Sequence, residues 1–383
     1  MKIIVGAVFS LPPFAPGKVW HRLHYILGLQ QLGHEVYFIE EVKPEWCVDA
    51  YDRPCDFERS INRYLFQTTM ERFGLMERAC QIYNRGEALF GLSRSALMTL
   101  SKEADVLINW TGHVATDFIL SNVKRRVYLD LDPVYTQLWQ AEYGEDLNFG
   151  AHDIFFSVGL NIGTPYTSIP DCGLEWHHTL PPVVLEYWPF HIDTSCKRFT
   201  TIASPVTYGD LHYQGEWYRA KQQEFERFAE LPRRSGQEFE IALTGYRTRE
   251  ASLQRLKDSG WFFGDASQIA DTSDYQHYIA RSRAEIGFAQ NAYIKGRSGW
   301  FSDRWSHYLA SGKPVLAQST GFERWVPAER GLLSFNSLEE AVEGVSRINQ
   351  DYRAHCQAAR ELAEEYLDHR KVLPRMLEIC TAH

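Results

Sequence analysis

The chain has 383 residues, more than one ordinary hydrophobic core holds, so two domains are expected. Its 44% hydrophobic and 23% charged residues are typical of a soluble globular protein. The formal net charge of −9 argues against partners that need a dominant basic surface, so neither nucleic acid nor an anionic membrane is expected as a partner.

The sequence predicts no membrane segment, no disulfide and no metal site. The first nine residues lack the features of a signal peptide, and no apolar run reaches the roughly 18 residues of a membrane span. The seven cysteines are scattered and never spaced as C-x-x-C, which is typical of free thiols in a reducing compartment. No His or carboxylate cluster shows metal-ligand spacing. We therefore expect a cytoplasmic protein with no integral membrane segment; a homodimer is left open.

Strand-like and helical segments alternate along the first half of the chain. The loop after the first apolar run is rich in Pro, and the helix that follows it is ended by Gly33. This strand–helix–strand unit lacks the G-x-G-x-x-G fingerprint of dinucleotide-binding enzymes. Residues 42–103 are mostly polar and aromatic and are expected to contain helical stretches. The predicted strands are 2–9, 35–41, 104–109, 125–133 and 152–159.

A second series of strands and helices fills the other half. Residues 160–198 carry several Pro and Gly and little periodicity, and they are interpreted as the crossover between domains. From Ser337 the pattern is helical. The predicted strands of this half are 199–204, 238–245, 260–265 and 284–290. The whole pattern predicts an α/β fold with mostly parallel sheets.

One stretch, RSGWFSDRWSHYLASGKPVLAQ at 297–318, combines a loop, a helix and a strand. Ser302 is a candidate N-cap, with Asp303 in the first turn, and Gly312 is expected to end the helix. Arg304 and His307 lie one turn apart on the same face.

The N-terminus of this helix is a candidate anion site. Its backbone N–H groups are unpaired and carry partial positive charge, and Lys295, Arg297 and Arg304 lie nearby in the sequence. The same pattern also occurs in an ordinary surface helix with a basic rim, so the local sequence leaves both readings open.

Two tandem Rossmann-like domains followed by a C-terminal helix resemble the GT-B glycosyltransferases. Residues 309–315, LASGKPV, are similar to the A-x-G-x-P-V turn of retaining members. The strings GWFSDR, YLASGKPV, LDLDPVYTQ and GLNIG resemble a group of bacterial proteins of that fold. The resemblance implies an acceptor domain at 1–185, a nucleotide-sugar domain at 186–365 and a helix at 366–383 that returns to the first domain.

The resemblance implies transfer of a sugar from a nucleotide-diphosphate sugar to a small-molecule or glycan acceptor. It implies no metal or other cofactor, and it leans towards retention of anomeric configuration. Three alternatives stay open: a nucleotide-sugar epimerase, a phosphorylase-like enzyme on the same fold, and a non-catalytic sugar-binding scaffold.

For the donor, the resemblance places positive charge and a helix N-terminus at the diphosphate. His307 stands where the family has a ribose-binding Glu. Trp261 or Phe262 would stack on the base, or else both belong to the core of their strand. We expect Arg304→Ala to weaken donor binding and leave the fold intact. The donor-binding candidates are Lys221, Arg247, Lys295, Arg297, Ser302, Asp303, Arg304 and His307.

For the acceptor and the chemistry, candidates come from loops after strands of the first half. Asp132 is the better base or sugar ligand, because it lies further out of its strand than Asp130, which is expected to be a structural turn residue. His24 lies off the apolar stripe of its helix, as does His21. The catalytic candidates are His21, Asp132, His113 and Arg304, and the acceptor-binding candidates are Gly17, Arg22, Tyr135 and Gln137.

Overall fold

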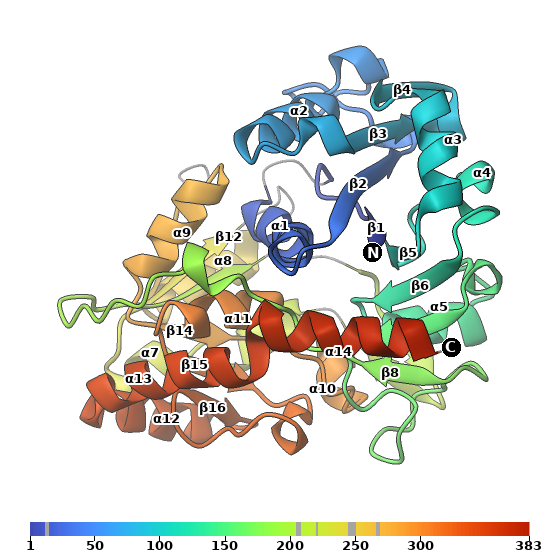
Figure 1. Cartoon of the computed structure of the whole chain (residues 1–383). Coiled ribbons are helices and arrows are strands. Elements are labelled where there is room, and N and C mark those ends of the chain that lie inside the picture. The colour runs from blue at the N-terminus through green and yellow to red at the C-terminus, as the bar shows by residue number, and fades with distance from the viewer. Residues whose placement is uncertain (12–14, 204–207, 220, 244–249, 266–268, 383) are drawn as a thin grey trace.

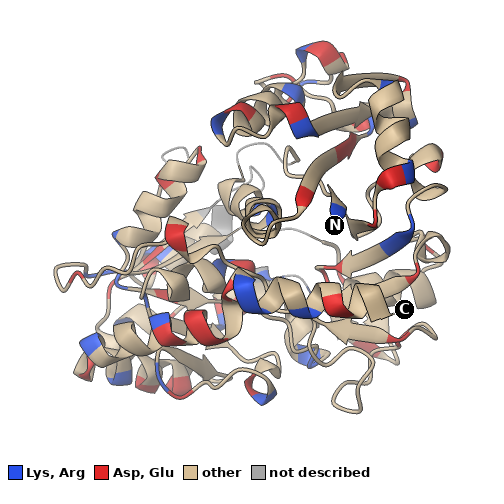
Figure 2. Ribbon diagram, in the orientation of Figure 1, with Lys and Arg blue, Asp and Glu red and all other residues tan. Residues whose placement is uncertain are grey.

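The computed structural model describes residues 1–383 except 12–14, 204–207, 220, 244–249, 266–268 and 383. Two α/β halves lie side by side, each built around its own sheet (Figure 1). The predicted boundary between domains, after residue 185, falls between the last strand of the first sheet and the first strand of the second. Lys and Arg are interspersed with Asp and Glu over both halves (Figure 2).

The first sheet has eight described strands in the order β4-β3-β2-β1-β5-β6-β7-β8, and all pairs except β3–β4 are parallel. The apolar side chains of its central strands are buried on both faces, as expected for a parallel sheet covered by helices. The strands are β1 Lys2–Gly6, β2 Glu35–Val42, β3 Ala79–Tyr83, β4 Ala88–Gly91, β5 Val106–Trp110, β6 Arg125–Asp130, β7 Ile154–Ser157 and β8 Trp176–His178. The helices are α1 Pro16–Gln31, α2 Ile61–Arg72, α3 Arg94–Glu103, α4 Asp117–Leu120 and α5 Tyr135–Ala141.

The second sheet has six described strands, all parallel, in the order β13-β12-β9-β14-β15-β16. A separate hairpin, β10–β11, follows β9. The strands are β9 Phe199–Ala203, β10 Leu211–Tyr213, β11 Glu216–Tyr218, β12 Phe239–Leu243, β13 Trp261–Gly264, β14 Ala284–Gly287, β15 Val315–Gln318 and β16 Leu332–Phe335. The helices are α6 Gln222–Arg227, α7 Leu231–Ser235, α8 Glu250–Asp258, α9 Thr272–Ala280, α10 Asn291–Lys295, α11 Asp303–Ala310, α12 Leu338–Gln350, α13 Tyr352–Leu362 and α14 His369–Ala382.

The α/β class and the parallel sheets are confirmed, and the stretch 42–103 contains the helices α2 and α3. It contributes β3 and β4, which the sequence did not indicate. Both strands are short, at five and four residues, so they carry too few residues to show a clear period. The predicted crossover at 160–198 contains β8, a three-residue strand at the edge of the first sheet.

Each sheet has a point where successive connections leave in opposite directions. In the first sheet it lies between β1 and β5, and in the second between β9 and β14. Ligands of open α/β sheets bind in the crevice at the carboxyl ends of the strands at such points. The side chains near these two points are therefore candidates for binding a ligand.

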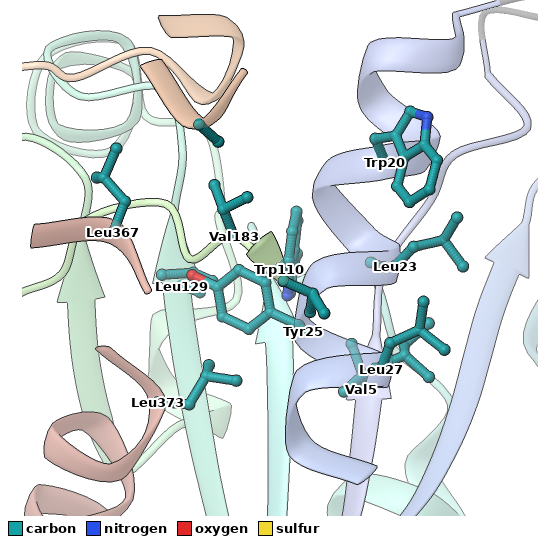
Figure 3. Close-up of a cluster of buried hydrophobic side chains, with 14 of the residues drawn as sticks. Val5, Trp20, Leu23, Tyr25, Leu27, Trp110, Leu129, Val183, Leu367 and Leu373 are labelled. Carbon is teal, nitrogen blue, oxygen red and sulfur yellow. The ribbon is translucent and has the colours of Figure 1, made fainter. Parts of the chain in front are cut away.

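Helix α1 is central to the joint between the halves. It contacts α9 and α11 of the second half and α14 at the end of the chain. Figure 3 shows Leu23 and Leu27 of α1 near Val5 of the first sheet, while Trp20 lies further along the helix, where its Nε1 donates to Thr272 O of the second half. The apolar stripe of α1 therefore covers the sheet, while its polar face is buried by the second half.

The C-terminal helix returns to the first half, as the resemblance implied (Figure 1). The π-helical turn η9, Ala363–Leu367, bends the chain between α13 and α14. Val183 then joins the turn, because its N–H donates to Leu367 O at 2.7 Å and its own carbonyl accepts from His369 N at 3.1 Å. Leu373 of α14 packs against Gly28 of α1.

Candidate functional site

A cluster of charged side chains lies between the two sheets. Its members come from the loop after β1 and the start of α1, the loop after β6, the strand β14 and the first turns of α6 and α11. Their charges influence one another's pKa, so the groups are close in space. The cations are Lys18, Arg22, Lys221 and Arg304, and the carboxylates are Asp132, Glu285 and Asp303.

Arg304 is held in the first turn of α11 by contacts to two neighbouring strands. The Oγ of Ser302 accepts from Arg304 N at 3.2 Å, so Ser302 is the N-cap, as predicted. The Arg304 Nε donates to the fully buried carboxylate of Glu285 on β14, and its Nη1 donates to Ile202 O on β9 at 2.8 Å. Among the described residues, Nη2 is buried and has no partner. Arg304 thus lies at the switch point of the second sheet with donor capacity to spare.

Lys221 lies beside this pair. Burial lowers its pKa well below 10.5, Arg304 lowers it further, and the carboxylates of Glu285 and Asp303 oppose the shift. A dianionic ligand here would restore the charged ammonium, since an opposite charge favours it. Arg247, the other predicted donor contact after a strand, lies outside the described residues.

Asp303 projects from the first turn of α11 towards the first half. Its Oδ2 is 3.7 Å from Nδ1 of His21, which is 4% exposed. Burial lowers the pKa of His21 well below 6.5, with Arg22 acting in the same direction. His21 is therefore neutral at physiological pH and a weak base. Its Nε2 is buried without a partner among the described residues.

Asp132 connects the two halves through phenol groups. The hydroxyl of Tyr293, on α10, donates to its Oδ1 at 3.1 Å, and Tyr208 also donates to it. Burial raises its pKa above 3.8, against the opposing effects of Tyr208, Lys18, Tyr293 and Arg22. The carboxylate is half-buried at the carboxyl end of the first sheet, which suits a proton acceptor.

Asp130 has the structural role that was predicted for it. It is fully buried, and its carboxylate accepts from Thr136 Oγ1 at 2.6 Å, Ser157 Oγ at 2.7 Å and Gln137 Nε2 at 3.1 Å. Gln137 also caps the start of α5, because its Oε1 accepts from Val134 N at 2.7 Å. The predicted acceptor contact of Gln137 is wrong, since both ends of its amide are engaged inside the fold.

Other predictions for the first half are also corrected. Tyr135 is fully buried against Tyr208 and Tyr293, so it has no surface for an acceptor. A Cβ added at Gly17 would lie 3.2 Å from the ring of Tyr275, so this glycine makes room for the second half rather than for a ligand. His24 is a core residue, because the second half covers the polar face of α1.

His307 does not contact a ribose site. Its ring stacks on Trp188 with centroids 4.6 Å apart, and its Nδ1 is 3.1 Å from the hydroxyl of Tyr275. It is 1% exposed, and burial lowers its pKa to about 3. The predicted donor role is wrong, because Trp188 and Tyr275 enclose the ring in the joint between the halves.

Of the remaining donor candidates, three lie at the surface, and Trp261 lies in the core. Lys295 is exposed and forms an ion pair with Glu216 of the β10–β11 hairpin. The side chain of Arg297 is exposed. Trp261 is core, with its Nε1 donating to Ala229 O at 2.8 Å, so it does not stack on a base. Phe262 is 43% exposed.

His113 lies at the switch point of the first sheet, after β5. Burial lowers its pKa to about 4, and Arg22, Lys18 and Lys43 act in the same direction. The imidazole is therefore neutral, and it helps to line a cavity of 760 Å³.

Four members of the site were missed in the sequence. Glu285 is a carboxylate within the apolar run AEIGFAQ, and this break in the pattern was its signal. Lys18 precedes Arg22 by one helical turn, which places both on one face of α1. Tyr208 and Tyr293 gave no signal, since the chain contains 20 tyrosines.

The chain matches no protein-family model and no curated protein sequence. Solved structures of glycosyltransferases share its fold along its whole length. Anabaena HepE in complex with UDP and glucose superposes with a TM-score of 0.64 at 10% identity, covering 100% of both chains. An α-glucosyltransferase in complex with UDP and a 13-mer DNA containing an HMU base gives a TM-score of 0.62 at 13% identity, covering 100% of this chain and 99% of the other. The GT-B fold is thus confirmed.

The exclusion of nucleic-acid partners from the net charge is wrong. Structures of the same fold contain DNA, with a mismatch in one and an abasic site in another. A global charge of −9 averages over both halves and says nothing about one local surface.

Two kinds of feature are absent from the part of the chain that the structure describes. No group of three or more His, Cys, Asp or Glu side chains in that part of the chain could hold a metal ion. None of the described helices combines the length and apolar character needed to cross a membrane.

Proposed function

We propose that this protein is a glycosyltransferase that uses a nucleotide-diphosphate sugar, with UDP as the nucleotide to test first. The observation that carries the proposal is the cluster of cations at the two switch points, centred on Arg304. The full-length similarity to structures that contain UDP and UDP-glucose supports it.

The leaving diphosphate would lie against Arg304 and Lys221. Departure of the nucleotide builds negative charge on the phosphate, and fixed cations in a partly dry cleft stabilise that charge most. Arg304 Nη2 is a buried donor with no partner in the described part of the chain, so a phosphate oxygen would complete its hydrogen bonding. Asp303 stands at the N-terminus of α11, so we propose that phosphate approaches the arginine side rather than the helix end.

The acceptor hydroxyl would lie against Asp132. With inversion, Asp132 takes the hydroxyl proton; with retention, it orients the hydroxyl. We favour retention, on the likeness of the turn after α11, and transfer without a metal, since Arg304 and Lys221 can neutralise the phosphate. His21, as a weak base beside Asp303, is the lesser candidate.

Nucleotide binding is the first test. Thermal unfolding is followed with UDP, UDP-glucose, GDP-mannose, ADP-glucose and dTDP-glucose, each with and without EDTA. A ligand at about 100-fold its Kd adds about 2.7 kcal/mol of stability, which shifts the melting temperature measurably. Binding of UDP that survives EDTA supports the proposal; no shift with any nucleotide refutes it and favours a scaffold.

The products then separate the remaining alternatives. UDP-glucose is incubated with sugars and with DNA carrying hydroxymethylated bases, and NMR reads the anomeric signals of the product. An α-linked product from this α-linked donor indicates retention. Conversion of the donor to another sugar without transfer indicates an epimerase, and phosphate-dependent cleavage indicates a phosphorylase-like enzyme.

The seven cysteines are all free, which supports the proposed cytoplasmic location. Fractionation of cells that express the protein tests it.

A further inference from the structure

A groove of 760 Å³ opens on the first half, along the carboxyl edge of its sheet. It is bounded by the end of β2, the turn after β3, the loop after β5 and the loop before β7, and it extends along α4 to the start of β6. His113, in the loop after β5, is one of the residues that line the groove. The groove therefore reaches the loop that follows β5, at the switch point of the first sheet.

The backbone around the groove is unusual. Four non-glycine residues that line it have positive φ: Asn84 at 43°, Arg85 at 56°, Thr111 at 48° and Asn148 at 62°. Such conformations are uncommon outside glycine, and a β-branched residue such as Thr111 rarely adopts one. Residues with this strain cluster at ligand sites, where surrounding structure holds them. They come from three separate loops, so one local turn does not explain them.

The side chains of the groove suit a hydroxylated ring. Trp46 supplies an aromatic wall, with its ring 5.9 Å from that of His113 in an edge-on arrangement. No described residue hydrogen-bonds to the His113 ring, which in its neutral form has one donor and one acceptor nitrogen. A sugar hydroxyl also donates and accepts. Aromatic walls combined with a few polar groups are typical of small-ligand pockets.

The charge of the lining opposes a polyanion at this place. Carboxylates outnumber cations among the lining residues. Arg126 is further neutralised by its ion pair with Asp153, and the Glu41 carboxylate accepts from Thr116 Oγ1 at 2.9 Å and Ala115 N at 2.8 Å.

We propose that the groove of Trp46, His113, Thr111, Asn84, Arg85 and Asn148 binds a neutral sugar residue. The identification of this sugar as the acceptor rests on the proposed transfer reaction. Binding of the sugar in the groove does not depend on that reaction.

The test measures sugar binding and nucleotide binding separately. The full-length protein, with and without saturating UDP, is titrated with glucose, galactose, mannose, maltose, cellobiose and lactose by saturation-transfer NMR and calorimetry. We expect at least one sugar to bind, and Trp46→Ala to raise its Kd at least about tenfold. UDP affinity should be unchanged in that variant. Trp46→Phe, which retains an aromatic wall, should recover part of the sugar affinity.

The matched control is Trp217→Ala, which removes a tryptophan that is 50% exposed on β11, outside the groove. It should leave sugar binding unchanged. The proposal is overturned if a folded Trp46→Ala protein binds the sugar as wild type does, or if no sugar binds to the wild type. It is also overturned if a short DNA duplex binds to the wild type, binds more weakly to Trp46→Ala, and is not displaced by sugars. If the wild type does not bind UDP, the proposed function is refuted instead. The sugar titration then still decides whether the groove binds a sugar.

Discussion

Arg304 and Glu285 form a buried ion pair that joins the first turn of α11 to the middle of the second sheet. Glu285 is fully buried, and its Oε2 has no partner among the described residues. Burial raises the pKa of Glu285 above 4.5, against the attraction of Arg304. The arginine thus has two tasks, since it compensates an interior carboxylate and offers a free donor to the cleft.

Arg304→Ala should weaken UDP binding at least about tenfold, because it removes the donor proposed for the phosphate. It should also lower the free energy of unfolding by about 3–5 kcal/mol, because an unpaired carboxylate stays buried. The sequence had led us to expect that this variant keeps an intact fold; the structure predicts that it is destabilised. Calorimetric titration and urea unfolding measure the two effects.

The double variant Arg304→Ala with Glu285→Gln separates the two tasks. It should regain much of the lost stability, since a neutral amide replaces the unpaired interior carboxylate, and still bind UDP weakly. Wild-type affinity for UDP in this double variant would remove α11 from the donor site.

Asp132→Asn should lower kcat/KM for transfer and abolish the acidic limb of its pH profile. The active form is the carboxylate, and burial raises its pKa above 3.8. As the pH is lowered, wild-type activity should therefore begin to fall at a higher pH than it would for an ordinary aspartate. The amide does not titrate, so the variant's profile should be flat there. Initial rates across pH measure this.

Asp130→Asn is the matched control, two residues away. It breaks a buried network with Thr136 and Ser157 and should destabilise the fold by about 1–3 kcal/mol. The remaining activity should keep the wild-type pH profile. The same profile in Asp132→Asn as in Asp130→Asn would exclude Asp132 as the titrating group.

The sequence predicted the two sheets well, because their central strands are apolar runs. It also predicted which loops end at the cleft, and Asp132 and His113 lie there. Residues that follow a strand directly are placed by the sheet itself. That rule needs no knowledge of side-chain contacts.

The errors concern residues whose surroundings come from distant parts of the chain. Helical spacing put His307 on the face of Arg304, but Trp188 and Tyr275 then enclose it from more than 100 and about 30 residues away. His24 looked polar-facing because the pattern of α1 shows only the side that meets its own sheet. The second half buries the other side, which periodicity within one helix does not reveal.

Gly312→Ala should lower the free energy of unfolding by about 2–4 kcal/mol. Gly312 ends α11 with a φ of 70°, and a Cβ there would lie 2.3 Å from Phe190 of the crossover. Gly173→Ala is the control, since its φ is 72° but no atom lies within 4 Å of the added Cβ. That variant should lose only the backbone part, about 1–2 kcal/mol. Equal losses in urea unfolding would mean that the Phe190 contact is not tight.

The joint between the halves contains histidines that must stay neutral. The N–H of Val184 is 3.0 Å from Nδ1 of His24, and the Nε1–H of Trp188 is 2.9 Å from its Nε2. Either neutral tautomer satisfies one of these donors, and the imidazolium satisfies neither. Burial lowers the pKa of His24 well below 6.5, and His307, 5.2 Å away between ring centroids, has a pKa of about 3.

These depressed pKa values make stability fall with acid. Below pH 6.5 the unfolded chain binds protons at these histidines that the folded protein does not, so each histidine costs about 1.4 kcal/mol between about pH 7.5 and about pH 5.5. His307→Gln does not titrate and should lose about 1.4 kcal/mol less than wild type over this interval. Urea unfolding at both pH values gives the difference, in which the variant's own change in stability cancels. A wild-type-sized loss in His307→Gln would show that His307 titrates in the folded protein with the same pKa as in the unfolded chain.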